Sequence, residues 1–405
     1  MLKPLNVLLL SFYYPPDISA GAFRAEALVN AFKRLLPSGS QVHVLASAPN
    51  RVYYVGGKAV PECETQGIAS IERLTLPGGG RGMGGQARAF ASYARQVKSR
   101  VRQGGYDLVV ATSSRLVTTL LGRWLAKRCG ATLYLDIRDN FVENLPYVLP
   151  YKAGWALAPV FALAERWALS GAQHINLVSG GFATYFEKHY PSARFSYHTN
   201  GIDLPFVQAV EHGAFQQHSV PDTSAKPPLE VLYAGNLGVG QGIEHIVPPL
   251  AQRLGSRVRF RIIGDGGGAA ALREHVAVLG LDNVVVEPPV SRDTLIKAYQ
   301  DADVLFLHLN TLPSLYSVLP SKLFEYAATG KPIWAGLPGY SARFVNEEIN
   351  NAAVFMPGSV DGAIKAFEQL TLGVSHRLSF VAQWRRDKIM NAMVSEMMML
   401  VSHDS

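Results

Sequence analysis

Residues 317–330, SVLPSKLFEYAATG, contain a loop followed by a short helix that is predicted to begin near Lys322 and to end at Gly330. A glycine directly after the last helical residue is a common helix stop. Apolar segments flank this stretch at residues 304–309 and 333–335, and both are predicted to be strands. The order strand, loop, helix, strand is the repeating unit of α/β proteins with parallel sheets.

The start of this predicted helix has the features of an anion site. The backbone N–H groups beside Ser321 and the ammonium group of Lys322 point toward one position, which suits a phosphate. Glu325 follows one turn later and can accept hydrogen bonds from adjacent sugar hydroxyls. Together these groups match what a nucleotide-sugar presents. The alternative is that Lys322 and Glu325, three residues apart on a helix, form an ordinary surface ion pair.

Length and composition indicate a globular protein of two domains. A chain of 405 residues exceeds the size at which one hydrophobic core stops growing. Its 48% hydrophobic and 17% charged residues exclude a disordered chain. The two cysteines, Cys63 and Cys129, favour a reducing compartment, so we expect a cytoplasmic protein. The histidines and the pair Asp301 and Asp303 show no metal-ligand pattern, and we expect neither a metal nor another cofactor.

The net charge of +7 is unevenly placed along the chain. One short stretch without acidic residues contains six basic residues, Arg81, Arg88, Arg95, Lys98, Arg100 and Arg102. Apolar residues recur within it at helical spacing, at Phe90, Tyr93, Val97 and Val101. A basic amphipathic helix from Arg81 to Arg102 is expected to lie on an anionic membrane surface. The alternative is a solvated helix that packs its apolar side on its own domain, and nucleic acid is not expected as a partner.

Strands and helices alternate on both sides of a polar segment that contains prolines. Residues 1–205 are predicted to form an N-terminal Rossmann-like domain on the acceptor side, 206–228 a linker, and 229–378 a Rossmann-like donor domain. A last helix, in 379–405, is expected to pack across both domains. We expect two facing doubly wound parallel sheets with a ligand cleft between them. The predicted strands are 5–12, 42–46, 68–76, 108–111, 133–137, 175–178, 231–234, 258–263, 284–287, 304–309, 333–335 and 354–356.

Two glycine-rich loops follow predicted strands of the second domain. Gly235, Asn236 and Gly238 belong to the sequence GNLGVGQG, and Gly264 opens the sequence GDGGG. Glycines let the backbone approach a ligand closely, and their amides can bind phosphate. Each loop alone is also compatible with a plain tight turn. The prolines at 248–249 are expected to shorten or kink the helix after the first loop.

The first domain has charged residues near predicted strand ends. Gly21 lies at a helix start after the first strand. Four charged residues follow it or end a later strand, Arg24, Asp136, Arg138 and Asp139. Charged groups are costly at a strand end unless they face a cleft, so they are candidate site residues. A structural ion-pair cluster explains them equally well.

These segments, in this order, resemble glycosyltransferase family 4, a group of retaining enzymes with the two-domain GT-B fold. The resemblance covers nearly the whole chain. It is carried by FYYPPDISAGAFRAEAL at 12–28, TNGID at 199–203, YAGNLGVGQGIEHI at 233–246, IGDGGG at 263–268, NVVVEPPVSRDTLIKAYQDADVLFL at 283–307 and LPSKLFEYAATGKPI at 319–333. The version with PSK, and with DIRD in the first half, is similar to the branch that builds bacterial surface polysaccharides from UDP-linked sugars.

The resemblance implies roles for residues of the second domain. Glu325 is implied to bind the nucleotide ribose, and Gly264 and Val290 to border the base. The diphosphate and sugar are implied to lie near three consecutive residues, Lys322, Leu323 and Phe324.

In the first domain, the resemblance implies that Gly21 approaches the phosphates. Arg138 and Asn200 are expected to contribute to the same cleft. Asp139 is the candidate for orienting the acceptor or polarising its hydroxyl, which makes Asp139, Lys322 and Glu325 the expected catalytic residues.

Two departures from the family pattern concern the donor. Ser317 stands where the family commonly has a glutamate that touches the donor sugar. Asn236 and Gln241 stand where the family commonly has arginine and lysine, and Lys322 is expected to compensate for them.

The resulting hypothesis is retaining transfer of a sugar from a nucleotide-sugar, UDP-linked, to a saccharide or polyprenyl-linked acceptor in bacterial surface polysaccharide synthesis, at the inner face of the cytoplasmic membrane. One alternative is a nucleotide-sugar epimerase that uses Asp136, Asp139 and Glu325 as acid and base groups. Another is a protein that binds a nucleotide-sugar without catalysis.

Overall fold

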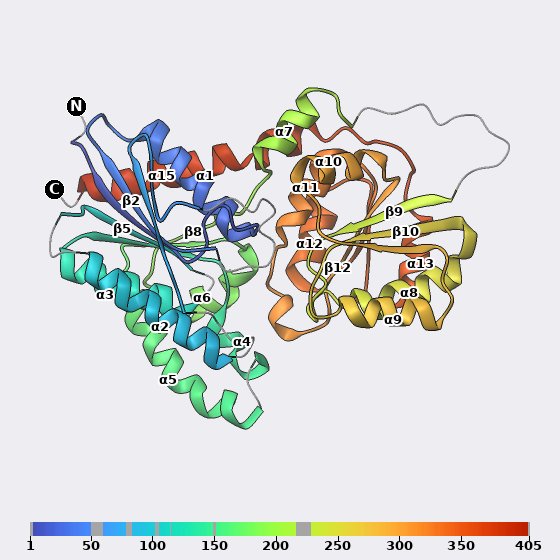
Figure 1. The fold of residues 1–405 in the computed structure, drawn as a ribbon, viewed down its shortest axis with the longest axis horizontal. Coiled ribbons are helices and arrows are strands. Elements are labelled where there is room, and N and C mark those ends of the chain that lie inside the picture. The colour runs from blue at the N-terminus through green and yellow to red at the C-terminus, as the bar shows by residue number, and fades with distance from the viewer. Residues whose placement is uncertain are drawn as a thin grey trace. The chain divides into compact units, whose positions relative to one another are not determined.

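The computed structural model describes residues 3–49, 60–77, 83–101, 105–113, 115–148, 151–215 and 228–403, and the chain divides into two compact units (Figure 1). Unit 1 comprises Met1–Asn200 together with Arg386–Ser405, and unit 2 comprises Gly201–Arg385. Each unit contains its own sheet with helices on both faces. The predicted α/β class with two parallel-sheet domains is confirmed.

The described strands of unit 1 form a sheet in the order β3-β4-β2-β1-β5-β6-β7-β8. Neighbouring strands are parallel except β3 and β4. The central strands are apolar and buried, as parallel strands covered on both faces must be. The short strands β3 and β8 were not predicted. The strands are β1 (Asn6–Ser11), β2 (Gln41–Ser47), β3 (Cys63–Gln66), β4 (Ala69–Leu74), β5 (Leu108–Ser113), β6 (Thr132–Ile137), β7 (His174–Leu177) and β8 (Phe195–Ser196).

Helices cover both faces of this sheet. On one face, α1 (Ala20–Leu35) packs against α15 (Arg386–His403). On the other, α3 (Leu116–Cys129) contacts both α2 (Met83–Arg100) and α5 (Tyr151–Leu169), and these three form one layer (Figure 1). The remaining α-helices of the described part of unit 1 are α4 (Phe141–Val148) and α6 (Ala183–His189).

Unit 2 contains a parallel sheet in the order β11-β10-β9-β12-β13-β14. All six strands agree with the predicted positions to within two residues. They are β9 (Leu229–Ala234), β10 (Val258–Ile263), β11 (Val284–Glu287), β12 (Val304–His308), β13 (Ile333–Gly336) and β14 (Ala352–Phe355). The helices around them are α7 (Leu204–Glu211), α8 (Ile243–Leu254), α9 (Ala269–Val278), α10 (Arg292–Asp301), α11 (Ser321–Thr329), α12 (Gly339–Glu348), α13 (Val360–Glu368) and α14 (Leu378–Trp384).

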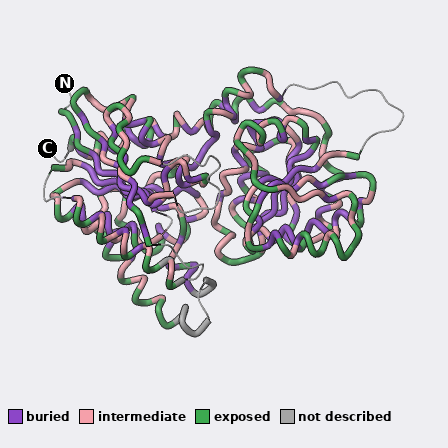
Figure 2. The backbone as a smooth tube through the Cα atoms, in the orientation of Figure 1, coloured by how far each residue is buried: buried purple, intermediate pink, exposed green. Residues whose placement is uncertain are grey.

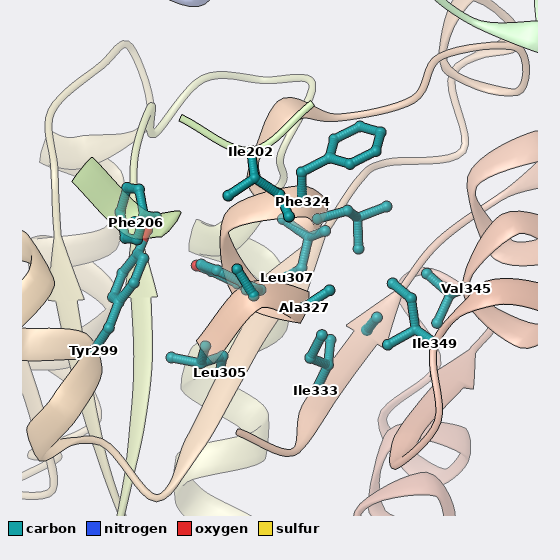
Figure 3. Packing of buried hydrophobic residues seen from close by; sticks show 14 of the residues in the cluster. Ile202, Phe206, Tyr299, Leu305, Leu307, Phe324, Ala327, Ile333, Val345 and Ile349 are labelled. Atoms are coloured by element: carbon teal, nitrogen blue, oxygen red, sulfur yellow. The ribbon is translucent and has the colours of Figure 1, made fainter. Parts of the chain in front are cut away.

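Helix α11 is fixed in unit 2 by a hydrophobic core. Ala327 of α11 lies near Leu305 and Leu307 of β12 and Ile333 of β13 (Figure 3). The ring of Phe324 packs on the other side, against aromatic rings of α12 and α14. The side chains of these five residues are at most 2% exposed. The helix also packs against α7 and α14. Its start is therefore held at a defined position on the sheet.

The predicted domain boundaries differ from the structure at two places. Residues 206–211, expected in a linker, belong to helix α7, and Phe206 is fully buried against Tyr299 in unit 2. The polar, proline-containing composition begins only after this apolar helical turn. Of the rest of the expected linker, residues 216–227 lie outside the described residues.

The expected single C-terminal helix is two helices. Arg385 separates α14 from α15 and forms a parallel bridge with Ile202. Helix α14 packs Phe380 and Val381 in the core of unit 2, whereas α15 packs its methionines in the core of unit 1. The segment thus contacts both units, but each helix belongs to one of them.

The prolines that were expected to shorten or kink α8 do not end it. Helix α8 continues from Ile243 to Leu254 with Pro248 and Pro249 inside it. The buried side chains of Ile246, Val247 and Leu250 hold the helix on the sheet despite the missing amide donor.

The predicted basic helix exists as α2, and its apolar side packs on its own unit. Phe90, Tyr93, Val97 and Val101 are at most 4% exposed, so this side does not face a membrane. The basic side chains of Arg88, Arg95 and Lys98 stay exposed; Arg81 and Arg102 lie outside the described residues. None of the helices in the described ranges combines the length and apolar composition that crossing a bilayer takes.

Candidate functional site

The carboxyl ends of β9, β10 and β12 place three predicted loops at one edge of the unit 2 sheet. The start of α11 is tied to this edge, because the backbone N–H of Ala234 donates to the Tyr326 hydroxyl, 3.3 Å away. Pro320 precedes α11 as its N-cap, and no side chain caps the helix. The first amides of α11, beside Ser321, therefore keep free hydrogen-bonding capacity for a ligand.

Lys322 extends from the start of α11 to the end of β9. Its ammonium nitrogen lies 4.9 Å from the centre of the Tyr233 ring. A Cβ atom added to Gly235 would lie 1.5 Å from the same nitrogen, so only glycine leaves room for it. Because Lys322 is desolvated in these surroundings, its pKa falls to about 8, although Glu325 opposes the shift. The ammonium makes no hydrogen bond to any described residue.

The predicted glycines of the two loops are needed for close backbone packing. A Cβ atom at Gly264 would lie 1.8 Å from the carbonyl oxygen of Gly235, so the two loops touch through their backbones. The backbone N–H of Gly235 also donates a hydrogen bond to the carbonyl oxygen of Ile263, 2.8 Å away. Gly264 thus positions Gly235, and through it Lys322, instead of offering an open surface to a base.

Asn236 and Gln241, which replace the charged residues of the family pattern, hold the shape of the first loop. The side-chain amide of Asn236 donates to Gln241 Oε1 at 2.9 Å, and the Gly238 backbone N–H donates to the same oxygen at 3.2 Å. His308 at the end of β12 fixes the loop from behind, because its Nδ1 lies 2.6 Å from the carbonyl oxygen of Gln241. Burial lowers the pKa of His308, so the neutral ring makes this contact.

Glu325 lies one helical turn after Lys322, as predicted, and is half-buried. Burial raises the pKa of its carboxyl group, while Arg292 and then Lys322 oppose the shift. Arg292 and Lys322 thus favour the ionised carboxylate, but the effect of burial on the pKa is larger. Glu325 makes no salt bridge within 4 Å among the described residues, so the surface ion pair with Lys322 is not formed.

Four other predicted residues of unit 2 differ in how far their side chains are exposed. Ser317 and Val290 are partly exposed, and Val290 packs against the core that contains α11. The side chains of Leu323 and Phe324 are fully buried, so they contribute to the site only through their backbone.

Two charged residues near the site were missed by the sequence reasoning. Arg292 at the start of α10 pairs with Asp203 and acts on the Glu325 carboxyl group. Glu244 in α8 is 6% exposed beside Gly268, and its Oε2 has no hydrogen-bond partner among the described residues. Glu244 was missed because an acidic residue in the first turn of a helix is usually explained by stabilisation of the helix end. Arg292 was missed because its proximity to Glu325 depends on tertiary packing.

In unit 1, Gly21 and Arg138 lie next to each other. A Cβ atom at Gly21 would lie 2.3 Å from the Arg138 guanidinium. Gly21 lies in the first turn of α1, where Ser19 caps the helix by accepting a hydrogen bond from the Ala22 N–H at 3.2 Å. The pair thus places a guanidinium at a helix start, an arrangement that suits an anion.

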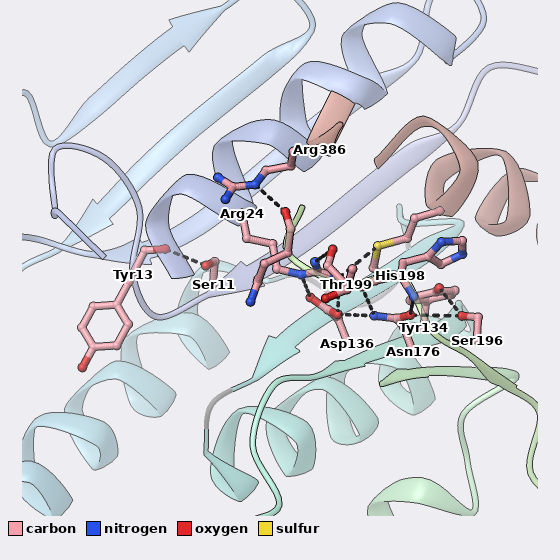
Figure 4. Close-up of polar contacts among 12 residues, drawn as sticks. Ser11, Tyr13, Arg24, Tyr134, Asp136, Asn176, Ser196, His198, Thr199 and Arg386 are labelled. Carbon is pink, nitrogen blue, oxygen red and sulfur yellow. Dashed lines mark hydrogen bonds and ion pairs between the residues drawn. The ribbon is translucent and has the colours of Figure 1, made fainter. Parts of the chain in front are cut away.

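Arg24, in contrast, was wrongly predicted to bind substrate. It is fully buried and donates two hydrogen bonds of 2.8 Å to the Asp136 carboxylate (Figure 4). It also donates to the carbonyl oxygens of His198 and Thr199 at 2.8 Å each. Burial alone raises the pKa of Asp136, but Arg24 outweighs it and lowers this pKa. The alternative of a structural ion pair is therefore correct for Arg24 and Asp136.

The remaining candidates of unit 1 are separate from this ion pair. Asp139 is exposed and lines a small hollow with Arg115 and the buried carboxylate Glu165. Glu165, which was not predicted, accepts hydrogen bonds from the hydroxyls of Tyr185 and Tyr190 at 2.9 and 2.8 Å. Asn200 is 7% exposed and its carbonyl oxygen accepts a hydrogen bond from Arg386 at 2.6 Å, so its backbone is structural.

Among the described residues, no three or more histidine, cysteine, aspartate or glutamate side chains are grouped so that they could hold a metal ion.

Comparison with known proteins agrees with this geometry. Residues 23–201 match the model of the glycosyl transferase 4-like domain, and residues 216–386 match glycosyl transferases group 1. The chain is 28% identical over 215 residues to the putative colanic acid biosynthesis glycosyl transferase WcaI of Escherichia coli K12. This alignment covers 51% of the chain and 52% of WcaI, so it spans about half the length of that relative.

Solved structures of low sequence identity share the fold. Sucrose-phosphate synthase of Thermosynechococcus elongatus aligns with a TM-score of 0.64 at 16% identity, over 98% of this chain and 97% of its own. HepE of Anabaena, in complex with UDP-glucose, aligns with a TM-score of 0.60 at 15% identity, over 97% of this chain and 99% of its own. These structures show the GT-B fold class of two parallel-sheet α/β domains, and the two family models, which together cover residues 23–201 and 216–386, place the chain in glycosyltransferase family 4.

Proposed function

We propose that the protein transfers a sugar, with retention, from a UDP-linked donor to a saccharide or lipid-linked acceptor during bacterial surface polysaccharide synthesis. The observation that carries this proposal is the position of Lys322, whose ammonium lies at Gly235 beside the uncapped start of α11. The names of the relatives support it, because WcaI is described as a colanic acid glycosyl transferase and HepE was solved with UDP-glucose.

In the proposed reaction, unit 2 stabilises the departing nucleoside diphosphate. Negative charge grows on the leaving phosphate as the glycosidic bond breaks, and Lys322 with the first amides of α11 is placed to balance it. Since the ammonium makes no hydrogen bond to any described residue, its donors are available to phosphate oxygens. These protein cations are proposed to suffice without a metal ion.

Glu325 is proposed to bind the ribose. Arg292 favours the ionised carboxylate, and an ionised carboxylate is a strong acceptor for two adjacent hydroxyls. In unit 1, Asp139 is proposed to orient the acceptor hydroxyl, because it is exposed at the rim of the hollow that also contains Arg115. We further propose that the protein acts in the cytoplasm, at the inner face of the membrane where lipid-linked acceptors lie.

The second candidate function is binding of a nucleotide-sugar without transfer. It is favoured by one observation, that Asn236 and Gln241 bond to each other where the family pattern has two cations. An epimerase is less well supported, because Asp136 is fully buried and engaged by Arg24, which leaves it no access to a sugar.

The test combines donor binding with turnover. A thermal-shift screen of UDP-, GDP- and dTDP-sugars identifies the donor, since a ligand that binds only the native state raises Tm. Release of UDP with a saccharide acceptor, in the presence of EDTA, then measures transfer. We expect Lys322→Ala to abolish turnover and Lys297→Ala, an exposed lysine on α10, to leave it unchanged. Donor binding without UDP release across a panel of acceptors would instead select the binding protein.

A further inference from the structure

The helix layer of unit 1 formed by α2, α3 and α5 has an outward surface that the proposed chemistry does not use. The sequence of α5, YKAGWALAPVFALAERWAL, is mostly apolar on every side, and the helix packs against α3 and α4. The burial colouring shows exposed residues along α5 (Figure 2). Its exposed large side chains are Leu157 (42%), Val160 (63%), Leu163 (71%) and Trp167 (44%).

These four residues, the α5 ridge, repeat every three or four positions. Residues at this spacing lie along one side of a helix. Isolated exposed apolar residues are normal on a protein surface, but a continuous row of four large ones marks a surface that contacts something apolar.

The exposed charge on the three helices themselves is of one sign. The three helices contain nine lysine and arginine residues, four on α2, three on α3 and two on α5. Their only acidic residue is Glu165, which is 4% exposed and bonded to two tyrosines. The exposed cations of the layer are Arg88, Arg95, Lys98, Lys127, Arg128 and Arg166.

Two tryptophans connect the cations to the apolar residues. The Lys98 ammonium lies 4.6 Å from the Trp124 ring, and the Arg128 guanidinium lies 5.2 Å from the same ring. The Arg123 guanidinium lies 6.0 Å from the ring of Trp167. Tryptophan with adjacent lysine and arginine is the composition that suits the boundary between lipid headgroups and acyl chains.

We propose that the outward side of α2, α3 and α5 is a docking surface for an anionic lipid bilayer, with the α5 ridge in the interface and the cations of the layer at the headgroups. A second copy of this chain fits less well, because two such surfaces would bring like charges together. A nucleic acid would use the cations but leave the α5 ridge in water. This inference rests on the proposed lipid-linked acceptor and assigns the membrane contact to one face of unit 1. Binding to the bilayer does not depend on turnover of the donor.

The test measures binding of the full chain to vesicles by flotation, with phosphatidylcholine vesicles compared to vesicles containing about one third phosphatidylglycerol. We expect binding to the anionic vesicles that weakens with added salt. Val160→Glu/Leu163→Glu should weaken it at least tenfold, because two charges then enter the apolar layer. Val278→Glu, a change of the same kind at a 77% exposed site on α9, should leave binding unchanged.

Two further variants separate the charge from the apolar contribution. Arg95→Glu removes one of the exposed cations and should weaken binding about fivefold or more, and Arg257→Glu in unit 2 is its control. Trp167→Phe should reduce the blue shift of tryptophan emission that anionic vesicles cause in the parent protein. An unchanged blue shift would show that the α5 ridge stays in water.

Several outcomes would overturn the proposal. Vesicle binding of Val160→Glu/Leu163→Glu equal to that of the parent protein would exclude the α5 ridge as the contact. A dimer in sedimentation velocity that this variant dissolves, in the absence of lipid, would make the surface a self-association site. Vesicle binding that persists in a protein without UDP release would leave the docking surface intact and refute only the proposed function.

Discussion

Substitution of Gly235 by alanine tests the position of Lys322 without changing either charged residue of the site. The new Cβ atom would lie 1.5 Å from the Lys322 ammonium nitrogen and 2.2 Å from its Cε. Both atoms belong to the far end of a flexible side chain, so the lysine can move away and the fold can adapt. Gly235 also has a φ of +151°, which costs alanine about 1–3 kcal/mol of stability.

The main effect of Gly235→Ala is expected in donor binding. A hydrogen bond from a charged group contributes about 1.5–3 kcal/mol, so losing the contact between Lys322 and phosphate should weaken UDP binding roughly 10- to 150-fold. Isothermal titration with UDP measures this change at a temperature where the variant is fully folded. Gly267→Ala in the neighbouring loop is the control, because nothing lies within 4 Å of its added Cβ atom.

A double-mutant cycle makes the test specific. If Gly235→Ala acts by displacing Lys322, its effect on UDP binding should largely disappear in a Lys322→Ala background. Additive effects of the two substitutions, or UDP binding by Gly235→Ala at the affinity of the parent protein, would refute the inferred position of the ammonium.

The other predictions concern pH, the ribose, the buried ion pair and the acceptor. The pKa of Lys322 in the free protein is about 8, so UDP affinity should fall up to tenfold per pH unit above this pH, as titration across pH 7–10 would show. The same depressed pKa means that the unfolded chain binds more protons between about pH 8 and 10.5, so the Lys322 contribution to stability should rise with pH there. Glu325→Ala should lose most of the preference for UDP over its 2′-deoxy analogue, and an unchanged preference would separate Glu325 from the ribose. Arg24→Leu should lower the free energy of unfolding by about 3–5 kcal/mol in denaturant titrations, because it leaves the buried Asp136 charge unpaired; a smaller loss than about 1 kcal/mol would contradict this. Asp139→Asn should reduce transfer to the acceptor while the Kd of UDP stays constant, and a parallel loss of both would argue against an acceptor role.

The sequence predicted the elements of unit 2 well because each has a strong local signal. Strand β12 begins with a continuous apolar run, strand β10 alternates apolar and charged residues, and Gly330 ends α11 in the left-handed conformation that favours glycine. The position of Lys322 three residues before Glu325 on a helix start was also correct, because it depends only on helical geometry.

What the sequence did not reveal depends on contacts between distant residues. Arg24 looked like a cleft residue because it follows Gly21, but its partners Asp136 and His198 are over 100 residues away. Composition placed residues 206–211 in a linker, since the apolar helix α7 is short and adjoins a polar segment. The α5 ridge was missed because an apolar helix reads as a buried one until its exposed side is seen.

The replacement of two family cations by Asn236 and Gln241 has a physical counterpart in the surroundings of Lys322. An exposed arginine is screened by water, whereas a desolvated ammonium interacts with a phosphate in a medium of lower effective dielectric constant. The depressed pKa of Lys322 shows that its charge is poorly compensated in the free protein. A diphosphate supplies that compensation, so part of its binding free energy comes from relieving an unfavourable charge. Additional cations on the loop would repel this ammonium and lower its pKa further. The neutral pair of Asn236 and Gln241 avoids that repulsion and keeps the loop in the shape that holds Gly235 against Lys322.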